Sequence, residues 1–206
     1  MTVSERLSQT LAKIRGVLPS GDSLDLLQSK GGRRSVIAAV TIYLALTLGL
    51  AFYWSMTPDS FDVVENRAKY LKSSDQSVTG AATTAALLEV TRLLLEKDGG
   101  YISNDITPPG TFLDNMPNWE YGALIQSRDL ARALREVLSR SQSQSQENVD
   151  LTLAEPRINF QNSSWALPAT ESEYRDARRY LQAYLDRLPK SGEDSAQFYA
   201  CLLYTS

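Results

Sequence analysis

The sequence contains no histidine and only one cysteine among its 206 residues. Histidine is the usual general base near neutral pH and the commonest imidazole ligand of metals, so its absence removes both kinds of chemistry. A lone cysteine can form neither an intramolecular disulfide nor a cysteine cluster for zinc or iron–sulfur centres. The net charge of −3 offers no basic surface to nucleic acid. We therefore expect no metal, no other cofactor and no nucleic-acid partner.

Charge and proline are also missing from one long segment, Val36 to Trp54, "VIAAVTIYLALTLGLAFYW". As a helix it is about 28 Å long, close to the hydrocarbon thickness of a bilayer. Tyr53 and Trp54 end the segment, as aromatic residues do at the membrane interface. A helix buried in a soluble domain is the alternative, but it would leave the lack of any polar face unexplained. The segment predicts a transmembrane helix over 36–54.

This segment differs from a cleaved signal peptide. Its apolar core is longer than that of a signal peptide, it begins after some 35 residues, and no small-residue cleavage pattern follows it. The basic residues Arg33 and Arg34 precede it, and acidic residues follow it. The positive-inside rule then predicts a cytoplasmic arm at 1–35 and an exported domain at 55–200, which in a Gram-negative bacterium is periplasmic.

The cytoplasmic arm carries apolar residues at helical spacing with basic residues around them: Leu7, Leu11, Ile14 and Leu18. Such a helix can lie on anionic lipid or bind a partner, and a weakly ordered tether is the equal alternative.

The exported part is predicted to be mainly α-helical, because no run alternates with period two. Helical segments are expected over 60–72, over 81–98, where Gly99 and Gly100 supply the stop, and over 117–140. On the last, Val137 is expected to be buried with four leucines, and three arginines are expected to face water: Arg128, Arg132 and Arg135. The "SRSQSQSQEN" stretch is predicted to be a solvated linker or frayed helix end.

A further helix is expected to begin at Thr170, because Thr170 and Glu173 have capping-box spacing. Its apolar residues repeat every three or four positions: Tyr174, Ala177, Leu181, Tyr184 and Leu188. This seam favours packing in a bundle over a coiled coil, since it is too short for the latter. "SAQFYA", from Ser195, is expected to start one more helix.

Two irregular segments separate these helices, at 99–122 and 156–168. The first holds the carboxylates Asp105, Asp114 and Glu120, and both contain amide and aromatic side chains that could bind a ligand: Asn115, Asn118, Trp119, Asn162 and Trp165. Carboxylates beside aromatic rings can bind glycans, and paired carboxylates can hydrolyse glycosidic bonds. The favoured interpretation is architectural, because Asp and Asn commonly cap turns and tryptophan commonly anchors packing.

Several strings in this region resemble a known family: "GGYISNDITPPG", "LDNMPNWEYGALIQSRDLARALR", "SRSQSQS" and "AEPRINFQNSSWALPATESEYRDA". They are similar to the family catalogued as domain of unknown function 2333, over most of the chain from the membrane span to about Ala200. The resemblance implies a single-pass inner-membrane protein of Gram-negative bacteria with an exported helical domain. It supplies no activity and no catalytic residues.

The last six residues, "CLLYTS", can be encoded by the transposon end sequence used in library preparation. We interpret 201–206 as a scar, which removes Cys201 from functional reasoning. Members of the resembled family continue further, so we expect the C-terminal part of the domain to be missing.

The leading hypothesis is a membrane-anchored structural or interaction protein of the envelope, which binds another protein or itself and is not an enzyme. The alternative is a protein that binds or hydrolyses envelope glycan, such as peptidoglycan, through Asp105, Asp114 or Glu120. A role beside a transporter or secretion machine is a weaker third idea.

Overall fold

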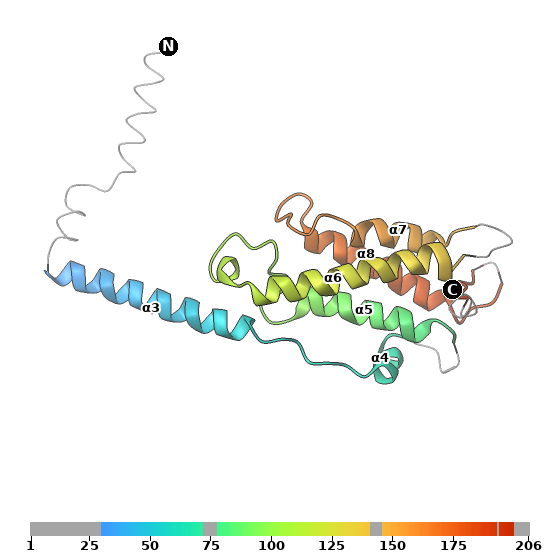
Figure 1. Ribbon diagram of the computed structural model, residues 1–206, viewed down its shortest axis with the longest axis horizontal. Helices are drawn as coiled ribbons and strands as arrows, with labels where there is room; N and C mark the ends of the chain where they lie inside the picture. The colour runs from blue at the N-terminus through green and yellow to red at the C-terminus, as the bar shows by residue number, and fades with distance from the viewer. Residues whose placement is uncertain (1–29, 72–77, 141–145, 193, 200–206) are drawn as a thin grey trace, which may run out of the picture. The chain divides into compact units, whose positions relative to one another are not determined.

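The computed structural model describes residues 30–71, 78–140, 146–192 and 194–199. Within these ranges the chain is mainly α-helical and has no β-strand, which confirms the predicted fold class (Figure 1). The chain divides into two units, Met1–Gly49 and Leu50–Ser206. The predicted basic arm helix, residues 141–145 of the Ser/Gln-rich linker and Cys201 lie outside the described residues.

The apolar segment forms helix α3, Lys30–Trp54, which begins before the predicted span. The hydroxyls of Thr41 and Thr47 are satisfied within the helix, because they donate to the carbonyls of Ile37 and Tyr43, each at 2.8 Å from Oγ1 to O. Among the helices in the described ranges, α3 is the one long and apolar enough to cross a membrane.

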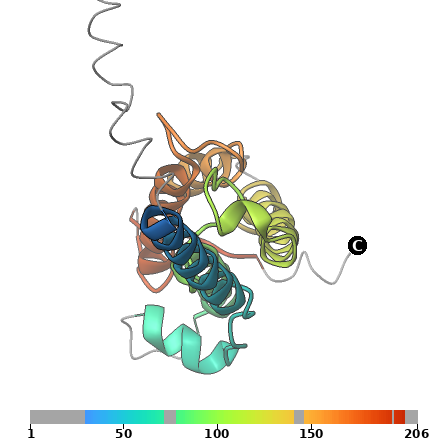
Figure 2. The same cartoon turned by 90° about the vertical axis from the view of Figure 1, so that its left-hand side faces the viewer.

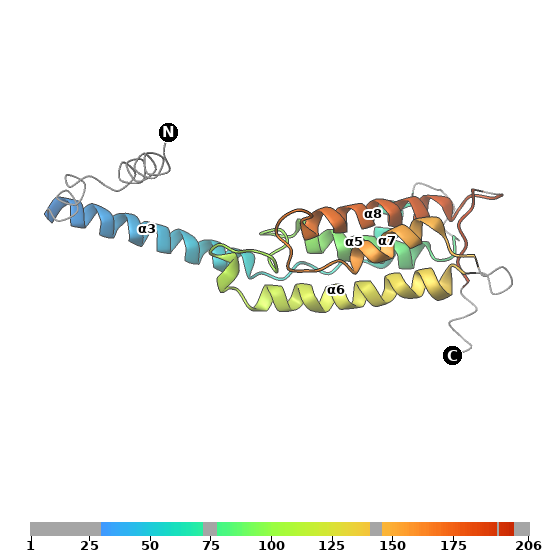
Figure 3. The ribbon, with the colours of Figure 1, turned by 90° about the horizontal axis from the view of Figure 1, so that it is seen from above.

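The second unit contains a bundle of four helices: α5 (Ala81–Glu96), α6 (Asn115–Ala133), α7 (Val149–Ile158) and α8 (Thr170–Arg187). They run alternately up and down (Figures 1 and 3), and Figure 2 views them along their axes. Their buried side chains form one hydrophobic core. α6 continues into a π-helical turn, Leu134–Leu138. The short helix α4, Val63–Tyr70, packs on α5 from outside the bundle, so the segment predicted over 60–72 is helical in its central part.

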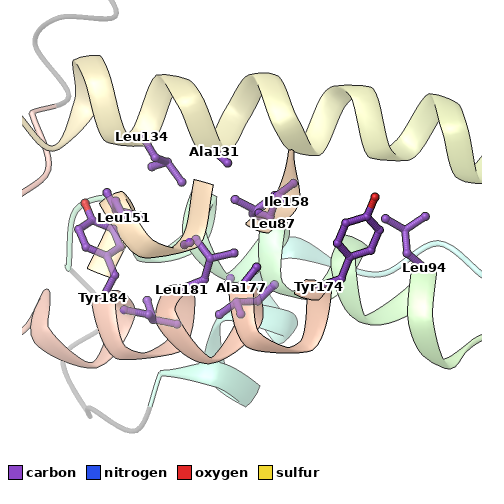
Figure 4. Close-up of a cluster of buried hydrophobic side chains, with 14 of the residues drawn as sticks. Leu87, Leu94, Ala131, Leu134, Leu151, Ile158, Tyr174, Ala177, Leu181 and Tyr184 are labelled. Atoms are coloured by element: carbon purple, nitrogen blue, oxygen red, sulfur yellow. The ribbon is translucent and has the colours of Figure 1, made fainter. Parts of the chain in front are cut away.

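The core confirms the apolar pattern predicted for α8. Figure 4 shows Tyr174, Ala177, Leu181 and Tyr184 of α8 directed at residues of the other helices, and each is at most 2% exposed. Leu188 packs on this cluster from its edge. The α8 seam is therefore covered by the chain's own bundle, as predicted.

Helix α7 was not expected, because Pro156 and the polar residues around it suggested irregular structure. Asn148 starts this helix by accepting hydrogen bonds at Oδ1 from the backbone N–H groups of Asp150 and Leu151. Burial of Leu151, Ala154 and Ile158 against the bundle stabilises the helix despite the missing donor of Pro156. The irregular segment thus begins at 159, not at 156.

The capping box at Thr170 was wrong. The N-cap is Ala169, and the Thr170 hydroxyl donates instead to the carbonyl of Gln161, at 2.7 Å from Oγ1 to O. This threonine is fully buried, so its hydroxyl needs a partner and finds it in the preceding loop.

The helix expected at "SAQFYA" was also wrong, since residues 195–199 are not helical. The N–H of Tyr199 donates to the carbonyl of Leu138 at the end of the π-helical turn (2.7 Å), and Tyr184 Oη donates to the carbonyl of Gln197 (2.8 Å). The ring of Phe198 lies against Gly80, where a Cβ would come within 2.3 Å of it. Hydrogen bonds to the bundle replace those that a helix would make internally.

The exposed face predicted for α6 was partly wrong. Val137 is 47% exposed, whereas Arg128 reaches across to α7 and donates to the carbonyls of Ile158 (3.0 Å) and Phe160 (2.7 Å). Arg135 pairs with two glutamates, and Arg132 alone of the three arginines is exposed. Long basic side chains here tie helices together.

Candidate functional site

Two loops close the same end of the bundle: 97–114 between α5 and α6, and 159–169 between α7 and α8 (Figures 1 and 3). Asn104 Nδ2 donates to the carbonyl of Ser164 (2.9 Å) and to Glu171 Oε2 (3.0 Å). Tyr101 Oη donates to the carbonyl of Asn162 (3.1 Å). The two predicted irregular segments therefore form one connected surface.

Glu120 lies beneath this surface with no solvent exposure. The backbone N–H groups of Ile102 and Ser103 donate to its carboxylate, each at 2.8 Å from N to O. The Ser103 hydroxyl also donates to it, and Lys97, whose side chain is 3% exposed, forms an ion pair with it. We call Glu120, Lys97, Ile102 and Ser103 the Glu120 lock. Residues of the loop and Lys97 supply the hydrogen bonds and the ion pair of this carboxylate, so Glu120 holds the loop in its conformation.

Asp105 lies beside the lock and is only partly buried. Its carboxylate rests on the backbone of Gly110, where a Cβ would lie 2.2 Å from Asp105 Oδ2. Burial raises the pKa of Asp105, as do the carboxylates of Glu120 and Glu171, while Lys97 opposes them. Among the described residues, no donor forms a hydrogen bond to this side chain.

Asp114 is exposed just before α6 and its side chain makes no capping hydrogen bond. Asn115 Nδ2 donates to the carbonyl of Ser55 (3.1 Å), and Asn118 is exposed. The three carboxylates thus occupy three environments: one is sealed, one is partly buried and one is in solvent.

The two aromatic candidates, Trp119 and Trp165, also lie in different environments. Trp119 is half-buried and packs on the hydrophobic core, whereas Trp165 is 63% exposed on the 159–169 loop. Asn162 is half-buried and acts through its backbone carbonyl, as described above. Glu120 is fully buried beneath the connected loops, so a glycan bound beside Trp165 has no access to that carboxylate.

The predicted interface residues lie towards the two ends of α3. Arg33 and Arg34 are exposed near its start, and Tyr53 is exposed near its end. Trp54 is half-buried within the second unit, where it lies against Gly99; a Cβ on that glycine would come within 2.7 Å of Trp54 Cγ.

A second region was not predicted. On the outer side of α8 lies an open cavity of about 490 Å³, which we call the arginine cavity, lined by Tyr70, Leu88, Arg175, Asp176, Arg178, Arg179 and Gln182. Three of these residues are arginines, and one of them, Arg179, forms an ion pair with Asp176. Arg178 pairs with Glu96 (2.9 Å) and leaves its buried Nε without a hydrogen bond, and the exposed Arg175 makes no ion pair within the described ranges. This region can accept an anionic group.

Glu89 of α5 lies behind the arginine cavity and is 6% exposed at its side chain. It accepts hydrogen bonds from Arg92 (2.7 Å from Nη2 to Oε1), Tyr70 (2.7 Å from Oη to Oε2) and Lys69 (3.2 Å from Nζ to Oε2). Hydrogen bonds from Arg92, followed by those from Tyr70 and Lys69, lower the pKa of Glu89 from 4.5 to about 2 against the opposing effect of burial. Burial and the Glu89 carboxylate raise the pKa of Tyr70. The anion at Glu89 therefore holds three side chains in place.

The sequence indicated the carboxylates of the 99–122 segment but not the residues that bind them. Glu120 lies between Met116 and Leu124 on the buried stripe of α6, and a charge at such a position is the signal that it needs an internal partner. The arginines 175, 178 and 179 are spaced by three and four residues on α8, which is the signal for one basic face. Among the described residues, no group of three or more Asp, Glu or Cys side chains is arranged to hold a metal ion.

Comparisons with known proteins give one finding. The family model described as an uncharacterized protein conserved in bacteria, DUF2333, matches residues 27–202. No curated protein and no solved structure matches the chain.

Proposed function

The chain belongs to this bacterial family, and on that premise we propose that it is an inner-membrane protein anchored by α3. Its helical bundle lies in the periplasm and has a structural or protein-interaction role in the cell envelope. The observation that supports this most is α3 itself, because 25 residues of helix carry no acidic residue and almost no buried surface. A helix with that composition is stable where lipid surrounds it.

The orientation follows from Arg33 and Arg34 before the apolar segment and the acidic residues after it. A reporter enzyme fused after residue 60 tests it. We expect activity when the reporter requires export and none when it requires the cytoplasm. The opposite pattern would reverse the proposed topology.

The arginine cavity is the surface that we assign to the protein partner. Among the described residues, Arg175 has no ion pair and the buried Nε of Arg178 has no hydrogen bond, which favours an acidic segment of another envelope protein, or of a second copy, as the partner. The mass of a crosslinked adduct distinguishes these two partners.

A photo-crosslinking residue at position 179 tests this assignment in intact cells. Arg179 is 76% exposed, so its replacement leaves the core unchanged. We expect a discrete adduct, which is lost when Arg175→Gln is added and kept when Arg132→Gln, also at an exposed position, is added on α6. Recovery of monomer alone, or of an adduct insensitive to Arg175→Gln, would count against the cavity as the partner surface.

A further inference from the structure

The loop end of the bundle exposes large apolar side chains. Four of them, which we call the apolar tips, lie on the two connected loops: Ile106 (60% exposed), Phe112 (75%), Trp165 (63%) and Leu167 (99%). Soluble monomers rarely expose such a group together. Their exposure needs a partner that is apolar.

The loops present these tips on a fixed base. Asn104 joins one loop to the other through Ser164 and Glu171, and the Glu120 lock fixes the backbone of residues 102 and 103 from below. The loops thus need little ordering when the tips are buried by a partner, which favours binding.

The same end meets the last residues of the apolar helix. Within the unit Leu50–Ser206, Trp54 lies against Gly99 and the carbonyl of Ser55 accepts a hydrogen bond from Asn115. Gly99 belongs to one loop and Asn115 begins α6 directly after it. If α3 spans the membrane, as proposed above, Trp54 marks the interfacial zone and this end of the bundle is next to it.

Charge at this end identifies the kind of contact. Residues 98–114 contain three aspartates and no basic residue, residues 159–169 contain no charged side chain, and Lys97 is sealed in the lock. Attraction to anionic lipid headgroups needs exposed lysine or arginine, which is missing here. Aromatic and aliphatic side chains instead enter the interface through burial of apolar surface.

We propose that the apolar tips insert into the exported face of the bilayer and hold the bundle against the membrane. The contact rests on the proposed function, because it needs α3 as the anchor. It is insensitive to salt and is not strengthened by anionic lipid. The bundle then presents its arginine cavity at a fixed distance from the membrane.

Fluorescence of the full chain in phosphatidylcholine vesicles tests the proposal. In a Cys201→Ser background, single cysteines replace Leu167 or Phe112 at the tips, Ser191 at the exposed opposite end, and Ala45 within α3. Each carries an environment-sensitive dye. Lipids brominated in the upper acyl chain serve as the quencher for the tips, and lipids brominated near the chain end serve for Ala45, at the middle of the 36–54 span. We expect blue-shifted emission and quenching at 167 and 112, no change at 191, and the same result when salt or anionic lipid is added.

Quenching at Ala45 reports the anchor separately. Ala45 quenched with 167 and 112 unquenched would overturn the docking and leave the anchor standing. Ala45 unquenched would overturn both. Blue-shifted emission at 167 without quenching by brominated lipid would show burial against a second copy and would also overturn the proposal.

A second variant removes the tips without touching the core. The substitutions Ile106→Ser, Phe112→Ser, Trp165→Ser and Leu167→Ser, with a labelled cysteine at the exposed Thr107, leave every hydrogen bond described above in place. We expect the thermal midpoint to be unchanged and the quenching at 107 to be lost relative to the same label beside intact tips. Quenching that persists would overturn the assignment of these side chains.

Discussion

Two buried glutamates, Glu89 and Glu120, show how one residue type serves two purposes in this bundle. Glu120 takes hydrogen bonds from two backbone N–H groups and one hydroxyl of a single loop, and its charge partner is the buried Lys97. Glu89 takes all of its hydrogen bonds from side chains, and two of its partners reach solvent: Lys69 is 54% exposed and Arg92 is 28% exposed.

Because their hydrogen-bond donors differ, the two carboxylates stabilise different parts of the molecule. The carboxylate of Glu120 fixes main chain, so its loss changes the shape of the loop end. The carboxylate of Glu89 fixes Tyr70, which lines the arginine cavity, so its loss changes the wall of a surface site. Burial alone therefore does not distinguish a carboxylate that holds a loop from one that shapes a surface site. The groups that donate hydrogen bonds to the carboxylate make this distinction.

The largest effect is expected from Glu120→Gln. It leaves the ammonium of Lys97 buried without a counter-charge, which costs about 3–5 kcal/mol of unfolding free energy. Denaturant unfolding in detergent micelles measures the loss. Asp114→Asn, in solvent on the same helix start, is the matched control and should stay within about 0.5 kcal/mol of the parent.

The double variant Lys97→Met, Glu120→Leu sharpens this result. Removal of both charges replaces a buried pair by apolar volume, and we expect it to recover much of the stability lost in Glu120→Gln. An undiminished loss would show that the hydrogen bonds to residues 102 and 103 dominate the lock.

Glu89→Gln should have a smaller effect with a particular pH dependence. The folded-state pKa of Glu89 is about 2, below its ordinary 4.5. Its contribution to stability is therefore complete above pH 4.5 and is lost as the pH falls towards 2. At neutral pH we expect the variant to be less stable by about 2 kcal/mol, because its exposed partners are screened by solvent.

Unfolding measured from pH 7 to pH 2 checks this. The difference in unfolding free energy between the parent and Glu89→Gln should decrease below pH 4.5. A difference that stays constant with pH would show that the Arg92 contact does not depend on charge. The thermal midpoint of Arg132→Gln should follow the parent at each pH.

Much of the fold could be predicted from the sequence, because apolar spacing determines which face of a helix is buried. α8 is the clearest case, since Tyr174, Ala177, Leu181 and Tyr184 lie in the core, as their spacing in the sequence predicted. α7 was missed because local propensity around Pro156 disagrees with the packing that stabilises the helix. The 195–199 segment fails in the opposite way: its helix-forming residues instead bond to carbonyls far along the chain.

The candidate site was harder to predict, because the residues that form it are far apart in the sequence. The residues bound by Glu120 precede it by 17 to 23 positions, and the periodicity of a single helix carries no information about them. The arginine cavity joins α4, α5 and α8, so its lining depends on how three helices pack. Carboxylates could be found by inspection of the loop, but their partners needed the tertiary structure.

The smallest effect concerns Asp105, a third carboxylate that has neither the lock of Glu120 nor the donors of Glu89. Its raised folded pKa means that the ionised form is disfavoured in the native state, so the charge lowers stability above that pKa. We expect Asp105→Asn to be more stable than the parent by about 0.5 kcal/mol at pH 7. The difference should shrink as the pH falls towards 4, and the contribution of Glu89 cancels because both proteins contain it. Denaturant unfolding at the two pH values measures this, and a variant less stable at pH 7 would show that Asp105 accepts a hydrogen bond and belongs with Glu89.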